Sequence, residues 1–163
     1  MKAERKYLVH YLDSKFDTTY ANTEYVLLGK DLEDFTIDLS PDVTTAKNIL
    51  GENSVKHGGY EASGDADPVY YDYDDALTEK LMELAMKRES GDACKTSYVE
   101  VLLKPGADGG APTVVRAVRE DVIIGINSYG GDTTGVQIPF TVHFAGNRVE
   151  GNFDISTKKF TTN

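Results

Sequence analysis

The segment Val136–Phe144 alternates apolar and polar side chains, which is the period of an extended β-strand and not of a helix. Its apolar members are Val136, Ile138, Phe140, Val142 and Phe144. The stretch Asp121–Asn127, just upstream, is also rich in β-branched residues. Between the two lies Gly130–Gly135, whose glycines can adopt the positive φ angles of a tight turn. The pattern predicts a β-hairpin and favours a fold built from antiparallel strands.

The loop of this hairpin has the glycine spacing of a phosphate-binding loop but lacks its chemistry. Four residues separate Gly130 from Gly135. A phosphate-binding loop then needs a lysine and a hydroxyl residue, and this chain has Val136 and Gln137 at those positions. The next segment has strand periodicity, so no helix N-terminus would face an anion. We therefore expect a turn here and no nucleotide site.

Other segments predict further strands and one helix. Strands are expected at Tyr7–Leu12, Tyr25–Leu28, Glu33–Leu39, Tyr98–Lys104, Thr113–Asn127 and Val149–Ile155, with a loop at Glu61–Pro68 and a tight turn at Ala145–Arg148. The helix is expected from Asp75 to about Arg88, where either Asp74 or Asp75 can cap the free amides. Its apolar face repeats at helical spacing and consists of Leu77, Leu81, Leu84 and Ala85.

These elements predict a mainly β fold, an antiparallel β-sandwich or partly open barrel with one flanking helix at about residues 75–88. A chain of 163 residues is long enough for one domain with a real core, and no change of composition marks a second. We expect residues 1–163 to form this single domain.

Two segments predict surfaces rather than core. In Glu33–Leu39, Phe35, Ile37 and Leu39 would face inward, which leaves Asp34, Thr36 and Asp38 on the other side. The arms Val43–Leu50 and Ser54–Tyr60 surround Gly51-Glu52-Asn53 but carry polar and glycine residues where a core hairpin would carry apolar ones. We expect a projecting hairpin at about residues 43–60.

The charge of the chain limits its partners. Seventeen basic and twenty-seven acidic residues give a net charge of −10. Proteins that grip nucleic acid carry a basic stripe, because release of counterions from the phosphates drives their binding. No such stripe occurs here, so we exclude tight binding of nucleic acid.

No arrangement of residues predicts catalysis, a metal or a cofactor. The aspartates at 65, 67, 72, 74 and 75 do not fit the ligand positions of a calcium loop. The three histidines are far apart, and the single cysteine, Cys94, allows no internal disulfide. We expect no enzyme, no signal peptide and no membrane segment, because the first residues lack an apolar run and no stretch approaches the length that spans a bilayer.

Four stretches in order carry a family resemblance: "DVTTAKNILGENSVKHGGYEAS", "DPVYYDYDDALTEKLMEL", "TSYVEVLL" and "SYGGDTTGVQIPFTVHFAGNRVEGNFD". They follow the expected strand Glu33–Leu39. The similarity covers the chain from about Glu24 to Asp154. In this order the chain resembles the major tail proteins, or tail tube proteins, of bacteriophages and prophages of Gram-positive bacteria. The motifs are structural and include no catalytic signature.

The resemblance implies a β-sandwich whose six copies close into a ring, with rings stacked into a hollow tube that conducts DNA into the host. The implied partners are further copies of the chain and other tail proteins, while DNA passes without tight binding. The implied location is the virion tail, after synthesis in the host bacterial cytoplasm. In such tubes a long hairpin reaches toward the adjacent ring, and its candidate contact residues here are Lys47, Asn48, Glu52, Asn53, Lys56 and His57. The lumen is typically acidic, and the candidates to line it are Asp34, Thr36 and Asp38, although outer solvent would suit the same face.

Two other functions remain open. One is the inner-tube subunit of a DNA-free contractile particle, such as a bacteriocin or injection system, built on the same fold. The other is a monomeric β-sandwich binding module, for example for a glycan. A binding module should show a concave aromatic platform, but the chain has no tryptophan. Its size also separates the cases, since a module would stay monomeric.

Overall fold

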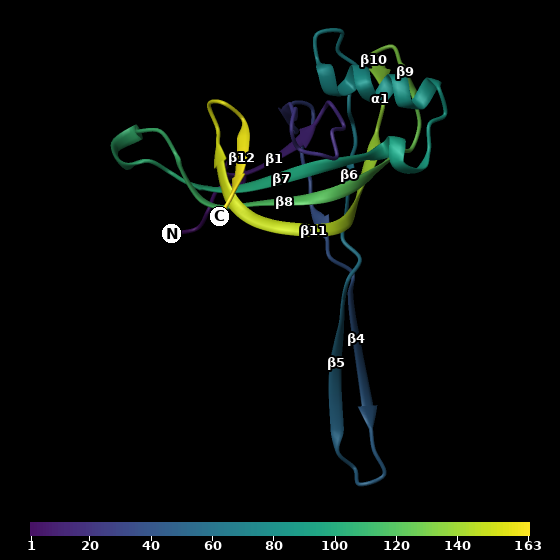
Figure 1. Ribbon diagram of the computed structural model, residues 1–163, viewed down its shortest axis with the longest axis vertical. Helices are drawn as coiled ribbons and strands as arrows, with labels where there is room; N and C mark the ends of the chain where they lie inside the picture. Colours follow the sequence, from purple (N-terminus) through teal and green to yellow (C-terminus); the bar gives the residue numbers. More distant parts are fainter.

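The computed structural model describes residues 1–163 and contains one eight-stranded antiparallel sheet, two two-stranded sheets and one α-helix (Figure 1). The strands are β1 Leu8–Asp13, β2 Tyr25–Leu27, β3 Ile37–Asp38, β4 Pro41–Lys47, β5 Asn53–Tyr60, β6 Ser63–Ala66, β7 Lys95–Lys104, β8 Thr113–Ile126, β9 Gly130–Asp132, β10 Gly135–Gln137, β11 Phe140–Asp154 and β12 Lys159–Thr162. The helix α1 spans Ala76–Met86, and three short 3-10 turns lie at Arg5–Tyr7, Gly91–Cys94 and Ala107–Gly109.

The large sheet has the strand order β2-β1-β7-β8-β11-β6-β3, and β12 pairs with the end of β11. Adjacent residues on its central strand β7 are buried on opposite faces. Tyr98 belongs to a cluster beneath α1, whereas Val99 belongs to a second cluster on the other face, and both are fully buried. Both faces of the inner strands are therefore covered, and they bury polar residues such as Thr96, Ser97 and Asp121 beside the apolar ones. The predicted β-sandwich with one flanking helix is confirmed.

The first cluster is formed where α1 packs on the sheet. It contains Leu12, Phe35, Ala66, Leu77, Leu81, Ala85, Tyr98, Val122, Ile124, Ile138, Phe140 and Val142. The second cluster lies where the end of β11 and the strand β12 fold back over the opposite face, with Phe160 packed at its margin. Its members are Tyr11, Tyr25, Val99, Val101, Leu103, Ala117 and Phe153.

The helix begins and packs as its sequence predicts. The Asp75 side chain accepts a hydrogen bond from the backbone N–H of Leu77 at 2.9 Å, so Asp75 and not Asp74 is the N-cap. The predicted apolar face of Leu77, Leu81, Leu84 and Ala85 is buried. The helix ends earlier than expected, at Met86, because Arg88 adopts a left-handed φ of 55°.

The predicted loop at Glu61–Pro68 is wrong, because β6 runs through it between β11 and β3. Ala66 is fully buried in the main core. The glycine in this strand reflects close packing rather than a turn, since a Cβ on Gly64 would lie 2.8 Å from the Phe35 ring.

The predicted tight turn at Ala145–Arg148 is also wrong. β11 continues through it, and its pairing with β8 shifts register there. Gly146 (φ 101°) and Asn147 (φ 56°) form an irregularity that bends the strand without reversing it. Figure 1 shows β11 curving strongly toward β12, the last strand, which the sequence did not predict.

The predicted strand Glu33–Leu39 is reduced to the two residues of β3. Phe35 is buried and Ile37 half-buried, but Leu39 is 49% exposed, so the inward pattern fails at its last member. The Arg5 guanidinium donates a hydrogen bond of 2.9 Å to the Phe35 carbonyl oxygen. This contact occupies a backbone acceptor that a longer strand would use.

The hairpin predicted from Val136–Phe144 is confirmed, with one interruption. β8 pairs with β11 through Ile126 and Phe140, and β9 pairs with β10 beyond them. Pro139 has no N–H, and the N–H of Ile138 donates to the carbonyl oxygen of Val69 instead of a neighbouring strand of the hairpin.

Neither α1 nor any other helical segment is long and apolar enough to cross a bilayer.

Candidate functional site

The most distinctive surface is the hairpin formed by β4 and β5, which stands away from the body of the molecule (Figure 1). Every residue of β4 is exposed, and in β5 only Gly59 is partly covered. The expected projecting hairpin is confirmed, although it begins at Pro41 rather than Val43. An isolated two-stranded ribbon is only marginally stable in water, so a hairpin of this length gains order by packing against something else.

The tip of the hairpin is held in one conformation by Asn48. Its side-chain oxygen accepts hydrogen bonds from the backbone N–H groups of Leu50 at 2.9 Å and Glu52 at 3.0 Å. Gly51 has a φ of 81°, which favours glycine. This turn presents Ile49 and Leu50 to solvent with relative exposures of 102% and 76%. A rigid tip with two exposed aliphatic side chains is typical of a surface that docks on a partner.

The strand register divides the other predicted hairpin residues between two faces. Lys47 pairs with Asn53, and Val43 pairs with His57, so these side chains share a face with Val55. Lys56 lies on the opposite face, opposite Thr44. The His57 ring contacts Tyr60 edge-on, with centroids 4.7 Å apart.

The hairpin is electrically neutral in an acidic chain. Asp42 and Glu52 balance Lys47 and Lys56, so the net charge of residues 41–60 is zero. The rest of the chain therefore carries the whole net charge of −10. A neutral arm can approach another copy of this acidic protein without the repulsion that two acidic surfaces would meet.

Where the hairpin joins the body, a hollow of about 850 Å³ lies between its root and the sheet. Leu39, Tyr60 and Phe144 contribute apolar surface to it. Arg148 lies at its side and bonds both Glu100 and Glu120, the second at 2.8 Å. Burial alone would lower the pKa of Arg148, but its hydrogen bonds to the two carboxylates outweigh this and raise it. Sequence reasoning missed this group because its members come from three strands.

The three candidate lumen residues are all exposed, as the alternation predicts. Asp38 lies on β3, and its carboxylate accepts hydrogen bonds from the backbone N–H and the hydroxyl of Ser40. Asp34 and Thr36 precede the strand, and Asp34 borders a hollow that also contains Arg5 and Lys30. The structure thus places these residues on the connection that leads into the hairpin, a few residues before Pro41.

Beneath this connection lies a buried histidine. His10 is 4% exposed, and its Nε2 atom lies 3.0 Å from the Arg5 guanidinium, which can only donate. The other ring nitrogen, Nδ1, therefore carries the proton and faces the Tyr98 hydroxyl. Burial, together with the nearby Arg5 charge, lowers the pKa of His10 to about 4. The ring is neutral at ordinary pH and ties the N-terminal segment to the core.

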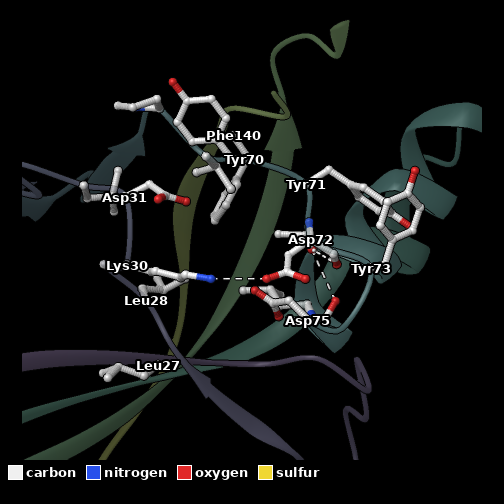
Figure 2. A pocket seen from close by; sticks show the side chains of 16 residues that line it. Leu27, Leu28, Lys30, Asp31, Tyr70, Tyr71, Asp72, Tyr73, Asp75 and Phe140 are labelled. Atoms are coloured by element: carbon white, nitrogen blue, oxygen red, sulfur yellow. Dashed lines mark hydrogen bonds and ion pairs between the residues drawn. The ribbon is translucent and has the colours of Figure 1, made fainter. Parts of the chain in front are cut away.

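A second candidate surface, the tyrosine groove, lies beside the entrance of α1 (Figure 2). It is formed by Leu27–Leu32 on one side and Pro68–Asp75 on the other, and its volume is about 280 Å³. Lys30 reaches across it to Asp72 at 3.2 Å. A backbone hydrogen bond from Asp74 and the contact with Lys30 lower the pKa of Asp72, so that it stays ionised. The sequence shows the aspartates and tyrosines of this groove but not that Leu27–Leu32 faces them.

The aspartate-rich segment and the cysteine serve the fold. Asp72 and Asp75 organise the helix entrance, and no group of three or more His, Cys, Asp or Glu side chains is placed to hold a metal ion. Cys94 is buried, and burial raises the pKa of its thiol. A buried thiol of this kind is unreactive.

No protein-family model matches this sequence, and no curated protein is significantly similar to it. The functional interpretation therefore depends on the fold, the two surfaces and the order of the sequence segments.

Proposed function

We propose that this chain is a structural subunit of a bacteriophage tail tube. Six copies form a ring, and the rings stack into a hollow tube that conducts DNA into the host. The observation that carries the proposal is the projecting hairpin, which has an ordered apolar tip and strands that are exposed along nearly their whole length.

The energetics of the hairpin favour an assembling protein over a monomeric one. Val43, Ile49, Leu50 and Val55 are between 52% and 102% exposed in the isolated chain. Covering aliphatic side chains stabilises by roughly 25 cal/mol per Å² of apolar surface. A hairpin that stays exposed forgoes this stabilisation, whereas one that docks on another subunit gains it.

The composition of the surface supports passage of DNA without binding. Six copies carry a charge of −60 (6 × −10), and the hairpin contributes none of it. Acidic groups facing a channel repel phosphates, so that DNA would slide through without being held. Other tail proteins would then close the two ends of the tube.

Deleting residues Lys47 to Lys56 tests the proposal. The variant should remain folded, because these residues contact neither core cluster. It should sediment as single subunits or rings at concentrations where the intact chain forms filaments. Circular dichroism and thermal unfolding control for folding, and filaments of normal length from the deleted chain would refute the proposal.

A further inference from the structure

We propose that the tyrosine groove is the receptor for the hairpin tip of a second copy of this chain. Ile49 and Leu50 would enter the groove, and Lys47 would approach its acidic rim. The inference rests on the proposed function, because it assigns the partner surface of the hairpin within a stacked assembly.

The hairpin tip and the tyrosine groove lie at opposite ends of the molecule. Figure 1 shows the hairpin at one end of the long axis and α1 with β9 and β10 at the other. The groove belongs to that second end, since Tyr70 pairs with Gln137 of β10 and Asp75 caps α1. A contact between opposite ends of identical subunits is heterologous, so it repeats from copy to copy and gives an open stack instead of a closed dimer.

The hairpin tip and the groove both present apolar side chains. The tip presents Ile49 and Leu50 on a turn fixed by Asn48, so little conformational entropy is lost on docking. The apolar part of the groove's lining includes Leu28, Leu32, Val69 and Phe140. Its volume suits aliphatic side chains and not a second globular surface.

The charge of the groove distinguishes it from another hollow at the same end of the molecule. The tyrosine groove carries Asp31, Asp72 and Asp75 against the single cation Lys30, a net charge of −2. The other hollow, at the far end of α1, carries Arg88 and Glu89 and is neutral. Lys47 lies beside the tip, one residue before its turn, and Glu52 lies at the end of the turn, so the tip as a whole is neutral. In the docked arrangement we propose, Lys47 faces the acidic rim and Glu52 faces away from it, and this orientation is favoured at the tyrosine groove and not at the neutral hollow.

Disulfide trapping tests the assignment in the full chain. The variant Ile49→Cys/Asp31→Cys places one thiol on the tip and one at the groove. Mild oxidation of the concentrated protein should give a ladder of linked subunits on a non-reducing gel. The native Cys94 lines the hollow that the control variant uses, so both double variants also carry Cys94→Ala. The matched control is Ile49→Cys/Ser128→Cys, whose second thiol lies in the other hollow and should give no ladder.

The outcomes separate the inference from the proposed function. A ladder from the Ser128 pair and none from the Asp31 pair would overturn the receptor assignment, while assembly of the unmodified chain would leave the tube proposal standing. If the unmodified chain sediments as a monomer at every concentration, both fail.

A charge exchange provides an independent measurement that needs no cysteine. Lys47→Glu and Asp31→Lys should each weaken self-association, by about tenfold for the loss of one close charge pair. The double variant should recover most of the association of the unmodified chain. Additive weakening in the double variant would overturn the inference, since the two residues would then not face each other.

Discussion

At the scale of single residues, His10 shows how a buried polar group links separate parts of the chain. Its ring lies between Arg5 of the N-terminal segment and Tyr98 of the central strand, and it contacts the edge of Phe35 with centroids 4.9 Å apart. Arg5 in turn bonds the Phe35 carbonyl. These contacts fix the connection that carries Asp34 and leads into the hairpin.

The neutral state of His10 predicts a pH dependence of stability. Its pKa is about 4 in the folded chain and 6.5 in the unfolded chain, so the folded chain binds fewer protons between these values. The free energy of unfolding should therefore decrease as the pH falls from 6.5 toward 4. At pH 5 this single group should destabilise the fold by about 2 kcal/mol relative to pH 8.

The variant His10→Gln isolates this effect, because an amide can keep both hydrogen bonds without titrating. Urea unfolding at pH 8 and pH 5 should show a smaller loss in the variant than in the unmodified chain. Carboxylates whose pKa is lowered, such as Asp17 and Asp154, contribute equally to both proteins and cancel in the difference. Equal losses in both proteins would contradict the account of His10.

At the scale of elements, the hairpin should act through its exposed apolar face. We expect Val55→Asp to leave the unfolding free energy within about 0.5 kcal/mol, since Val55 is 68% exposed. Filament formation should require at least tenfold more protein, because the added charge would be desolvated on docking. Sedimentation across a concentration series measures this shift.

Val115→Asp is the matched control for this variant. Val115 is also an exposed strand valine, at 58%, but lies on β8 outside the hairpin. Its substitution should leave the concentration for assembly unchanged. If both variants shift assembly by the same amount, the hairpin has no special part in stacking.

Local sequence patterns predicted the elements whose conformation depends mainly on residues close by in the sequence. The cap at Asp75, the apolar spacing of α1 and the alternation around Phe140 depend on near neighbours, and all three elements form. The hairpin was predictable for the opposite reason, since too few apolar residues are available to place it in the core.

The wrong predictions fall on segments whose conformation depends on contacts with residues far away in the sequence. β6 reads as a loop because Gly64 and its aspartate neighbours suggest turns, but Phe35 and β11 hold it in the sheet. β11 passes through Gly146 and Asn147 because β8 pairs on both sides of them. The tyrosine groove forms because Leu27–Leu32 faces the segment that begins at Pro68, about forty residues further along the chain. No local sequence pattern predicts this contact.

At the scale of the whole molecule, the proposed tube gives the net charge of −10 a role, because acidic groups in its lumen would repel the phosphates of DNA. Replacing both Asp34 and Asp38 by lysine should preserve ring formation, since both side chains are exposed. If this face lines the lumen, an assembled particle with the two lysines should deliver DNA more slowly, because cations would hold the phosphates.

The matched control replaces the same two aspartates by asparagine, which removes the charge without reversing it. Asparagine at position 38 can still accept the hydrogen bond from Ser40 that Asp38 accepts. We expect this control to deliver DNA nearly as well as the unmodified particle. Normal delivery by the lysine variant would assign Asp34 and Asp38 to the outer surface. A particle that assembles around no DNA at all would instead support the DNA-free contractile alternative.

Negative-stain imaging of the concentrated chain tests the central claim most directly. The account predicts rings of sixfold symmetry that stack into hollow filaments, with the hairpin bridging successive rings. Particles that remain single 17.9 kDa subunits at every concentration would contradict it and would favour a monomeric binding module.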